Sequence, residues 1–421
     1  MNLKYMIFLP FIVIALSFIT DFYTWQGIKT IGNYFANESL AYYLRFIFWS
    51  LAILVPTGLI VGFASAKFST EQNLILRIFV NVFFAYTAAK LSFGVFLLAE
   101  DLFRLLFASF KFLFAESGLR SFTFISRNII LSSLGFLSFL LMIGVFVHAV
   151  FVNSYNFKIH NIKIEFEHLP ASFDGFKIVQ FSDFHAGSHS NIKKLTKGIE
   201  LLNSLDADVL VFTGDMVNHK ADEFEEFSDV FNEINPEFGK FSILGNHDYG
   251  DYVRWENESD KEENVQKLIE LQTKAGFKVL LNENTIITKG NDSIFIAGVE
   301  NWGHKFVKKG DLPKALVGIP DEAFVVLLSH DPSHWDLEVK NNLKRIDLTL
   351  SGHTHGFQFG IETKWFKWSP VQYVYKEWSG LSEHNGIYRY INRGFGFIGL
   401  EGRVGIRPEI SVIELVSLSK L

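Results

Sequence analysis

Cysteine is absent from the 421 residues of the chain. Its absence excludes disulfide bonds and thiolate metal ligands, and it is compatible with reducing and oxidising compartments alike. Charged residues are scarce in the first part: residues 1–155 contain 10 Lys and Arg and 6 Asp and Glu, whereas residues 156–421 contain 29 and 39. The two parts carry net charges of +4 and −10. Because neither part has a basic stripe, we expect no nucleic-acid partner.

Long apolar stretches fill the charge-poor part, at about 5–20, 46–63, 78–98 and 129–152. A helix needs about 20 mostly apolar residues to cross a bilayer, because its backbone polar groups must bond one another in lipid. The first stretch is short, and we interpret it as an uncleaved anchor rather than a signal peptide. We therefore predict that residues 1–155 form a membrane domain with about four transmembrane helices.

Three details of this domain qualify the prediction. Lys90 lies inside the third stretch, and we expect its side chain to extend toward the membrane interface. The segment 101–120 mixes Phe and Leu with spaced Arg and Lys, so it is either an interfacial amphipathic helix or an extension of the third span. Basic residues number five on the side of the termini and six on the other, so the orientation in the membrane stays open.

Residues 156–421 have a different pattern of apolar and polar residues. Seven apolar runs of 5 to 7 residues alternate with longer polar segments of helical periodicity, a pattern typical of an α/β domain. We expect strands at about 176–181, 208–213, 240–244, 277–281, 293–299, 324–329 and 347–351. Helices are expected near 192–205, 223–234, 262–275 and 334–343.

Five of these seven strands are followed by Asp, Asn or His, in the sequences SDFHAG, TGDMVN, GNHDYG, SHDP and SGHTHG. Ligands bind beyond the carboxyl ends of strands in α/β sheets, so the five endings are expected to converge on one crevice. They supply two Asp, one Asn and four His, which are oxygen and nitrogen ligands suited to Mn, Fe or Zn. Seven ligands are too many for one ion. They predict two ions about 3.5–4 Å apart that share a carboxylate, supply hydroxide near neutral pH and hold a phosphoryl oxygen.

The order of these five blocks resembles the calcineurin-like metallophosphoesterase superfamily over roughly residues 174–415. The sequences KIVQFSDFHAG, SHDP, RGFG and RPEI resemble its bacterial membrane-associated branch. The resemblance implies a four-layer αββα sandwich, in which two mixed sheets pack face to face with helices outside and the metals at one edge. It also implies an integral protein of a bacterial cytoplasmic membrane that hydrolyses phosphate esters or acid anhydrides.

Carried over by position, the resemblance implies the following metal ligands: Asp183, His185 and His355 for the first ion, Asn246, His330 and His353 for the second, and Asp215 bridging the two. We expect Mn at both sites, with Fe or Zn as alternatives. His247 is implied as the catalytic histidine that stabilises the phosphoryl oxygens or protonates the leaving group. Asp248 is expected to orient its imidazole, and Thr354 to turn away between the two His ligands.

Substrate contacts are suggested by three further residues. Phe357 stands where many members of this branch have a second glycine after GHTHG, and its phenyl ring would narrow the site or offer an apolar wall to a lipid-like substrate. Arg254 and Trp255 would bind a second phosphate and stack on a base or sugar; an ordinary surface loop with one anchoring aromatic is the alternative. Residues 364–381, rich in Trp, Tyr and Lys, suit a membrane headgroup region or a lid over the site.

These observations favour a membrane-anchored phosphoesterase or pyrophosphatase, with a phosphorylated lipid-linked or cell-envelope substrate and the membrane as its partners. One alternative is a tethered enzyme for soluble phosphoesters or nucleotides. The other is a non-catalytic membrane scaffold, which would be expected to have lost ligands, whereas all seven are present. No protein partner can be inferred from the sequence.

Overall fold

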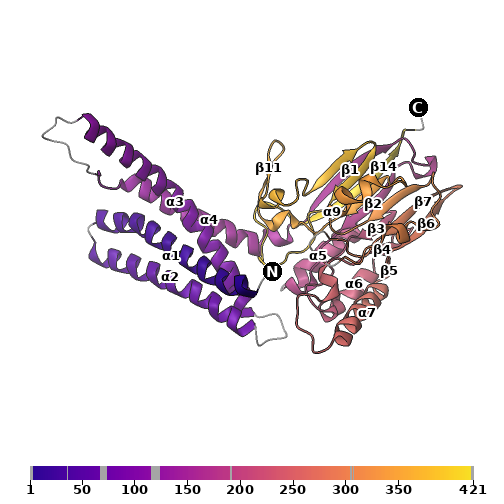
Figure 1. The fold of residues 1–421 in the computed structure, drawn as a ribbon, viewed down its shortest axis with the longest axis horizontal. Coiled ribbons are helices and arrows are strands. Elements are labelled where there is room, and N and C mark those ends of the chain that lie inside the picture. The colour runs from indigo at the N-terminus through magenta and orange to yellow at the C-terminus, as the bar shows by residue number, and fades with distance from the viewer. Residues whose placement is uncertain are drawn as a thin grey trace. The chain divides into compact units, whose positions relative to one another are not determined.

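The computed structural model describes residues 3–35, 37–66, 74–114, 124–189, 192–303, 306 and 308–418, with side chains from residue 14 onward except 66, 74 and 192. Contacts within the chain divide it into two compact units, Met1–His148 and Ala149–Leu421 (Figure 1). The division lies seven residues before the predicted boundary, because the last turn of the fourth helix packs with the second unit.

The first unit is helical, with α1 at Leu3–Tyr34, α2 at Glu38–Ala66, α3 at Leu74–Phe114 and most of α4, Ile129–Phe151. Within the described residues, three segments are long and apolar enough to cross a membrane: Glu38–Ser65, Ile75–Phe114 and Ile129–Tyr155. The first predicted span falls at the start of α1, where the side chains through residue 13 lie outside those described. The segment from 101 continues α3 to Phe114, which favours the extension over a separate interfacial helix.

The prediction for Lys90 is wrong. Its side chain is buried rather than extended to an interface, and its Nζ lies 2.9 Å from Oδ1 of Asp21 on α1. The Nζ also donates to Oγ of Ser17 at 2.8 Å, and Tyr86 donates its hydroxyl to Asp21 at 2.9 Å. The lysine is retained inside the bundle because an opposite charge on a neighbouring helix pairs with it, which hydropathy along one helix does not reveal.

The second unit contains two six-stranded mixed sheets, which confirms the predicted fold class. The first has the order β1 (Lys158–Phe166), β14 (Glu409–Ser417), β2 (Phe176–Phe181), β3 (Val209–Phe212), β4 (Lys240–Ser242) and β5 (Phe277–Val279). The second has the order β12 (Gly380–His384), β13 (Ile387–Ile391), β9 (Leu348–Ser351), β8 (Phe324–Leu328), β7 (Asp292–Gly298) and β6 (Glu283–Lys289). In each sheet four neighbouring strands are parallel: β2, β3, β4 and β5 in the first, and β13, β9, β8 and β7 in the second.

Alternating side chains explain the layers. Successive residues of a strand point to opposite faces, and Ile178 of β2 joins the core between the sheets while Val179 faces the helices. The outer cores are covered by helices α5 (Ile192–Asn203), α6 (Ser228–Asn232) and α7 (Glu258–Lys274) on the first sheet and α8 (Leu312–Ala315) and α9 (Ser333–Leu337) on the second. Figure 1 shows α5, α6 and α7 gathered on the side of β3, β4 and β5.

Candidate dinuclear metal site

The candidate ligands lie directly after the carboxyl ends of parallel strands. Asp183 follows β2, Asp215 follows β3 and Asn246 follows β4 in the first sheet. His185 also follows β2, whereas the other three histidines come from the second sheet: His330 follows β8, and His353 and His355 follow β9. Because the two sheets pack face to face, these loops meet at one edge of the sandwich, where the sequence pattern placed them.

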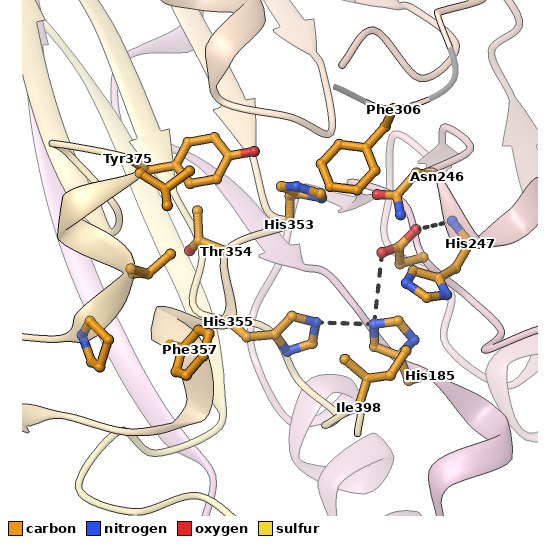
Figure 2. Close-up of a pocket in the computed structure, with 14 residues that line it drawn as sticks. His185, Asn246, His247, Phe306, His353, Thr354, His355, Phe357, Tyr375 and Ile398 are labelled. Atoms are coloured by element: carbon orange, nitrogen blue, oxygen red, sulfur yellow. Dashed lines mark hydrogen bonds and ion pairs between the residues drawn. The ribbon is translucent and has the colours of Figure 1, made fainter. Parts of the chain in front are cut away.

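The side chains form two groups that could each hold a metal ion (Figure 2). The first contains Asp183, His185 and His355, and the second contains Asp215, His330 and His353; within each group the ligand atoms lie within 4.8 Å of one another. In the first group Nε2 of His355 lies 3.3 Å from Oδ1 of Asp183 and 3.0 Å from Nε2 of His185.

Asp215 connects the two groups. Its Oδ2 lies 3.1 Å from Nε2 of His330 in the second group and 3.7 Å from Nε2 of His185 in the first. Its other oxygen, Oδ1, accepts the backbone N–H of His247 at 2.8 Å. The carboxylate is therefore positioned between the two groups, as a shared ligand must be.

Backbone strain accompanies the ligands. Five of them have left-handed φ angles: Asp183 at 54°, His185 at 48°, Asp215 at 62°, His353 at 70° and His355 at 51°. Non-glycine residues adopt this conformation at a cost of roughly 1–2 kcal/mol each. Gly245 shows how tightly the loops approach, since a Cβ there would lie 2.2 Å from Oδ1 of Asp215. The fold thus holds these side chains in place at the expense of local stability.

The electrostatics of the site suit a divalent cation. Burial and the neighbouring His355 lower the pKa of His185 well below its usual value, which keeps its imidazole neutral and able to donate a lone pair. Burial alone would raise the pKa of Asp215, but His330 and His247 outweigh it and keep the carboxyl ionised. Burial opposes protonation of His330, yet Asp215 and Asp183 raise its pKa to about 10, which shows that the two carboxylates favour positive charge at this position.

A buried polar atom supports the same fit. Within the described part of the chain, Oδ1 of Asn246 has no hydrogen-bond partner. The Nδ2 of Asn246 donates to the hydroxyl of Tyr252 at 2.8 Å, which leaves Oδ1 as the free atom of the amide. Buried polar atoms without partners are costly, and an oxygen and imidazole donor set without sulfur fits Mn, Fe or Zn.

A contact with the backbone orients His330. Nδ1 of His330 donates to the backbone carbonyl of Thr213 at 2.7 Å, an assignment that leaves Nε2 for the site. Nδ1 of His353 faces Nε2 of His330 at 3.2 Å, while its Nε2 lies 3.8 Å from Oδ2 of Asp331. Asp331 directly follows His330 in the SHDP block, and its Oδ2 accepts the hydroxyl of Tyr375 at 3.3 Å.

The predicted role of Asp248 is wrong. Its carboxylate accepts four backbone N–H groups, from Gly245, Asp215, Met216 and Val217, at 2.8 to 3.2 Å. The ring of His247 instead uses Nδ1 to bond the carbonyl of Asn218 at 2.9 Å. Burial and the charge of Asp215 raise the pKa of Asp248 to about 7. Asp248 therefore ties two site loops together, and a backbone carbonyl orients His247.

The loop after this block places Tyr252, rather than Arg254 or Trp255, beside the site. The ring of Tyr252 stacks on that of His247, with centroids 4.2 Å apart. Trp255 donates its indole N–H to the carbonyl of Gly250 at 2.7 Å and so anchors its own loop. Neither Arg254 nor Trp255 lines the pocket, which favours the surface-loop alternative for both. Sequence reasoning missed Tyr252, whose position depends on the turn at Gly250.

The metal groups open into a pocket of about 290 Å³. Its polar side consists of His185, Asp215, Asn246, His247, His353 and His355. Its remaining lining is mainly apolar: Phe306, Phe357, Pro370, Val371, Val374, Tyr375 and Ile398, with Thr354 between. Figure 2 shows Phe357 and Tyr375 across from His185 and His247. Phe357 thus lies at the site as expected, while Thr354 turns its hydroxyl to the carbonyl of Trp378 at 2.7 Å.

The fold and the site define a phosphoesterase with two His/Asp metal groups. Comparison with known families agrees: residues 176–357 match the calcineurin-like phosphoesterases, and residues 4–154 match a family described as a probable calcineurin-like phosphoesterase transmembrane domain. The chain belongs to the calcineurin-like metallophosphoesterases. It is a metallophosphoesterase hydrolase anchored in a membrane by transmembrane helices, which confirms the resemblance seen in the sequence.

Relatives with this domain come from bacteria and animals. The uncharacterized metallophosphoesterase YkuE of Bacillus subtilis is 33% identical over 265 residues, covering 61% of this chain and 84% of YkuE. The zebrafish (Danio rerio) transmembrane protein with metallophosphoesterase domain is 29% identical over 269 residues, covering 61% of this chain and 57% of that protein. An uncharacterized metallophosphoesterase of Aquifex aeolicus is 27% identical, covering 65% of this chain and 96% of the relative.

Proposed function

We propose that this metallophosphoesterase hydrolyses the phosphate ester or pyrophosphate linkage of a lipid-linked substrate, such as a cell-envelope precursor, in a bacterial cytoplasmic membrane. The observation that carries the proposal is the composition of the pocket. The pocket presents carboxylates and imidazoles for metal and phosphoryl groups, and its lining also includes the apolar side chains of Phe306, Phe357, Val374 and Ile398. An enzyme for a small, fully polar phosphoester would have no use for so large an apolar wall beside its metals.

Seven side chains would hold the metals. Asp183, His185 and His355 would bind the first ion, Asn246, His330 and His353 the second, and Asp215 both. The position of Asp215 between the groups and the unpartnered Oδ1 of Asn246 support this assignment. Two bound ions would polarise a phosphoryl oxygen and lower the pKa of a water. Mn²⁺ is our choice for both positions, and the donor set would also accept Fe or Zn.

His247 would be the catalytic group that the protein supplies in addition to the metal ions. Its Nδ1 is engaged by the Asn218 carbonyl, so Nε2 is the nitrogen that can exchange a proton or contact a phosphoryl oxygen. The residue lines the pocket, and stacking on Tyr252 restricts rotation of its ring. A histidine held in this way can protonate the leaving-group oxygen as the ester or anhydride bond breaks.

The test compares two substrates on the full-length protein in lipid nanodiscs. One is a lipid-linked pyrophosphate and the other is a water-soluble pyrophosphate with the same headgroup. Binding energy from the tail is expected to be used in the transition state, so removing the tail should depress kcat as well as raise KM. Equal kcat/KM for the two substrates would overturn the lipid-linked assignment and leave a tethered enzyme for soluble phosphoesters. No hydrolysis of either would favour the scaffold.

A further inference from the structure

We infer that residues 357–374, hereafter the interfacial loop, insert into the surface of the bilayer that holds the transmembrane helices of the same chain. The loop begins at the rim of the metal pocket and contains the small hairpin of β10 (Ile361–Glu362) and β11 (Lys367–Trp368). The inference deepens the proposed function but does not depend on it, because docking onto lipid is a property of the surface and can be measured without any reaction.

Exposed apolar side chains are concentrated on this loop. Six are more than half exposed: Phe357, Ile361, Trp365, Phe366, Tyr373 and Val374. Trp365 is 87% exposed and Tyr373 is 78% exposed. Elsewhere on the described second unit, large apolar side chains with such exposure are scattered, as at Val317 and Leu343. A cluster of this kind marks a surface that meets an apolar partner.

The interfacial loop is held in a defined conformation by contacts with the rest of the second unit. Beneath it, Val371, Trp378 and Ile406 form a small core of their own. Ser369 donates its hydroxyl to the carbonyl of Gly356 at 2.8 Å, and Glu362 of the hairpin forms an ion pair with Arg393. The exposed aromatic side chains therefore stand on a supported scaffold, and their exposure does not follow from a lack of contacts in the loop.

The identity of the partner follows from where the last membrane helix joins the catalytic unit. The final turn of α4 belongs to that unit, and the backbone N–H of Arg403 donates to the carbonyl of Ala149 at 3.3 Å. Asn153, two residues after the helix, donates its side-chain amide to the carbonyl of Arg403. A helix that crosses a bilayer ends at its surface, so the segment around Arg403 must lie near that surface.

The same segment carries the start of the interfacial loop. Gln358 donates its side-chain amide to the carbonyl of Leu400 at 2.6 Å, and the backbone N–H of Gly360 donates to the carbonyl of Val404 at 2.9 Å. Residues 400–404 are therefore fastened on one side to the end of α4 and on the other to the loop. One short segment thus joins the loop to the residues at the end of α4.

The chemistry of the loop suits the lipid headgroup region. Trp and Tyr concentrate at membrane interfaces, and nearby lysines pair with lipid phosphates. Lys364 lies with its Nζ 5.1 Å from the ring centre of Trp365, and Lys376 is exposed just beyond the loop. Phe357 and Val374 belong both to this surface and to the pocket lining. Docking would therefore open the pocket toward lipid, and a tailed substrate could enter without leaving the bilayer.

The experiment uses the absence of native cysteine. Full-length variants with one introduced cysteine, Trp365→Cys or Tyr373→Cys, are labelled with an environment-sensitive fluorophore and reconstituted into phosphatidylcholine and phosphatidylglycerol vesicles. The vesicles contain lipids with a nitroxide on the headgroup or on the acyl chain. Leu343→Cys is the matched control, because Leu343 is fully exposed and precedes β9, at the opposite end of that strand from the metal site.

We expect nitroxide lipids to quench the label at 365 or 373 at least threefold more than the label at 343. Quenching no greater than at 343 for both positions would overturn the inference. Hydrolysis of a lipid-linked pyrophosphate by the unlabelled wild-type protein, measured in vesicles of the same lipids, reports separately on the proposed function. An active wild type whose labelled loop is unquenched refutes the docking alone, and a quenched loop with an inactive wild type refutes the proposed function alone.

Discussion

His185 and His355 are separated by 170 residues in the chain, yet their Nε2 atoms face each other at 3.0 Å inside a buried site. The carboxylate of Asp183 lies 3.3 Å from the same nitrogen of His355. Both histidines have left-handed backbones. The loops therefore hold the metal-binding groups of Asp183, His185 and His355 close together at a conformational cost. This is the arrangement expected of a preorganised cation site.

His247→Ala should reduce kcat by about 10²- to 10⁴-fold, the usual contribution of a general acid. Bound metal should be unchanged, because the His247 ring belongs to neither metal group and contacts the Asn218 carbonyl. The measurement is kcat on substrates with good and poor leaving groups, together with metal analysis. Asp215→Ala is the contrasting variant and should lose metal. Wild-type kcat on the poor leaving group would remove the proposed role of His247.

Phe357→Gly tests the apolar wall. Phe357 has a left-handed φ of 56°, so glycine should relieve backbone strain of about 1 kcal/mol or more and raise the unfolding temperature. The same change removes the phenyl ring from the pocket and should lower the ratio of kcat/KM for lipid-linked over soluble substrate. Phe357→Leu keeps an apolar side chain and should preserve most of that ratio. A ratio that glycine leaves unchanged would contradict a lipid-binding wall.

Much of the fold follows from local pattern. All seven predicted strands are present, because each is a short apolar run bounded by turn residues. Strands β1, β6 and β10 to β14 were not predicted. The pairing of β1 with β14 joins Lys158 to Glu409, and such long-range partners leave no local signal. The predicted helix at 223–234 is instead a 3-10 helix, Ala221–Phe227, followed by the short α6. A helix-periodic pattern predicts which face of the segment is buried, but not whether the segment is an α-helix or a 3-10 helix.

At the site, too, some features could be predicted from local sequence and others depend on contacts that it does not show. The candidate metal ligands could be predicted because each follows a strand of a sheet, whose geometry brings strand ends together. The bond from His247 to the carbonyl of Asn218 could not, since it depends on the conformation of a loop. Tyr252 was missed for the same reason. Lys90 was misjudged because its partner, Asp21, lies on another helix.

Lys90→Met should destabilise the membrane unit by about 3–5 kcal/mol, since it leaves Asp21 as an uncompensated buried charge. Lys90 and Asp21 are both fully buried in the first unit. The double variant Lys90→Met with Asp21→Asn should recover most of the loss, because neither charge then remains. Thermal unfolding of the full-length protein in detergent gives the comparison. A single variant as stable as the wild type would show that the ion pair contributes nothing.

Lys240 predicts a pH dependence of stability. Its side chain is buried, and burial lowers its pKa from 10.5 to about 8. Between these two values the unfolded chain binds the proton that the folded chain has released, so stability should rise as pH increases from about 8 to 10.5. Unfolding of the wild type is compared with Lys240→Met across this range. If the two proteins show the same pH dependence, Lys240 does not titrate in this way.

The central claim is that two ions occupy the site and support hydrolysis. The most direct test is metal analysis of the purified full-length protein, combined with activity before and after chelation. The account predicts two divalent ions per chain, loss of activity and a lower unfolding temperature on chelation, and recovery of both with Mn²⁺, because ions that bind only the folded state stabilise it. A chain that hydrolyses phosphoesters equally well after chelation, with an unchanged unfolding temperature, would contradict it.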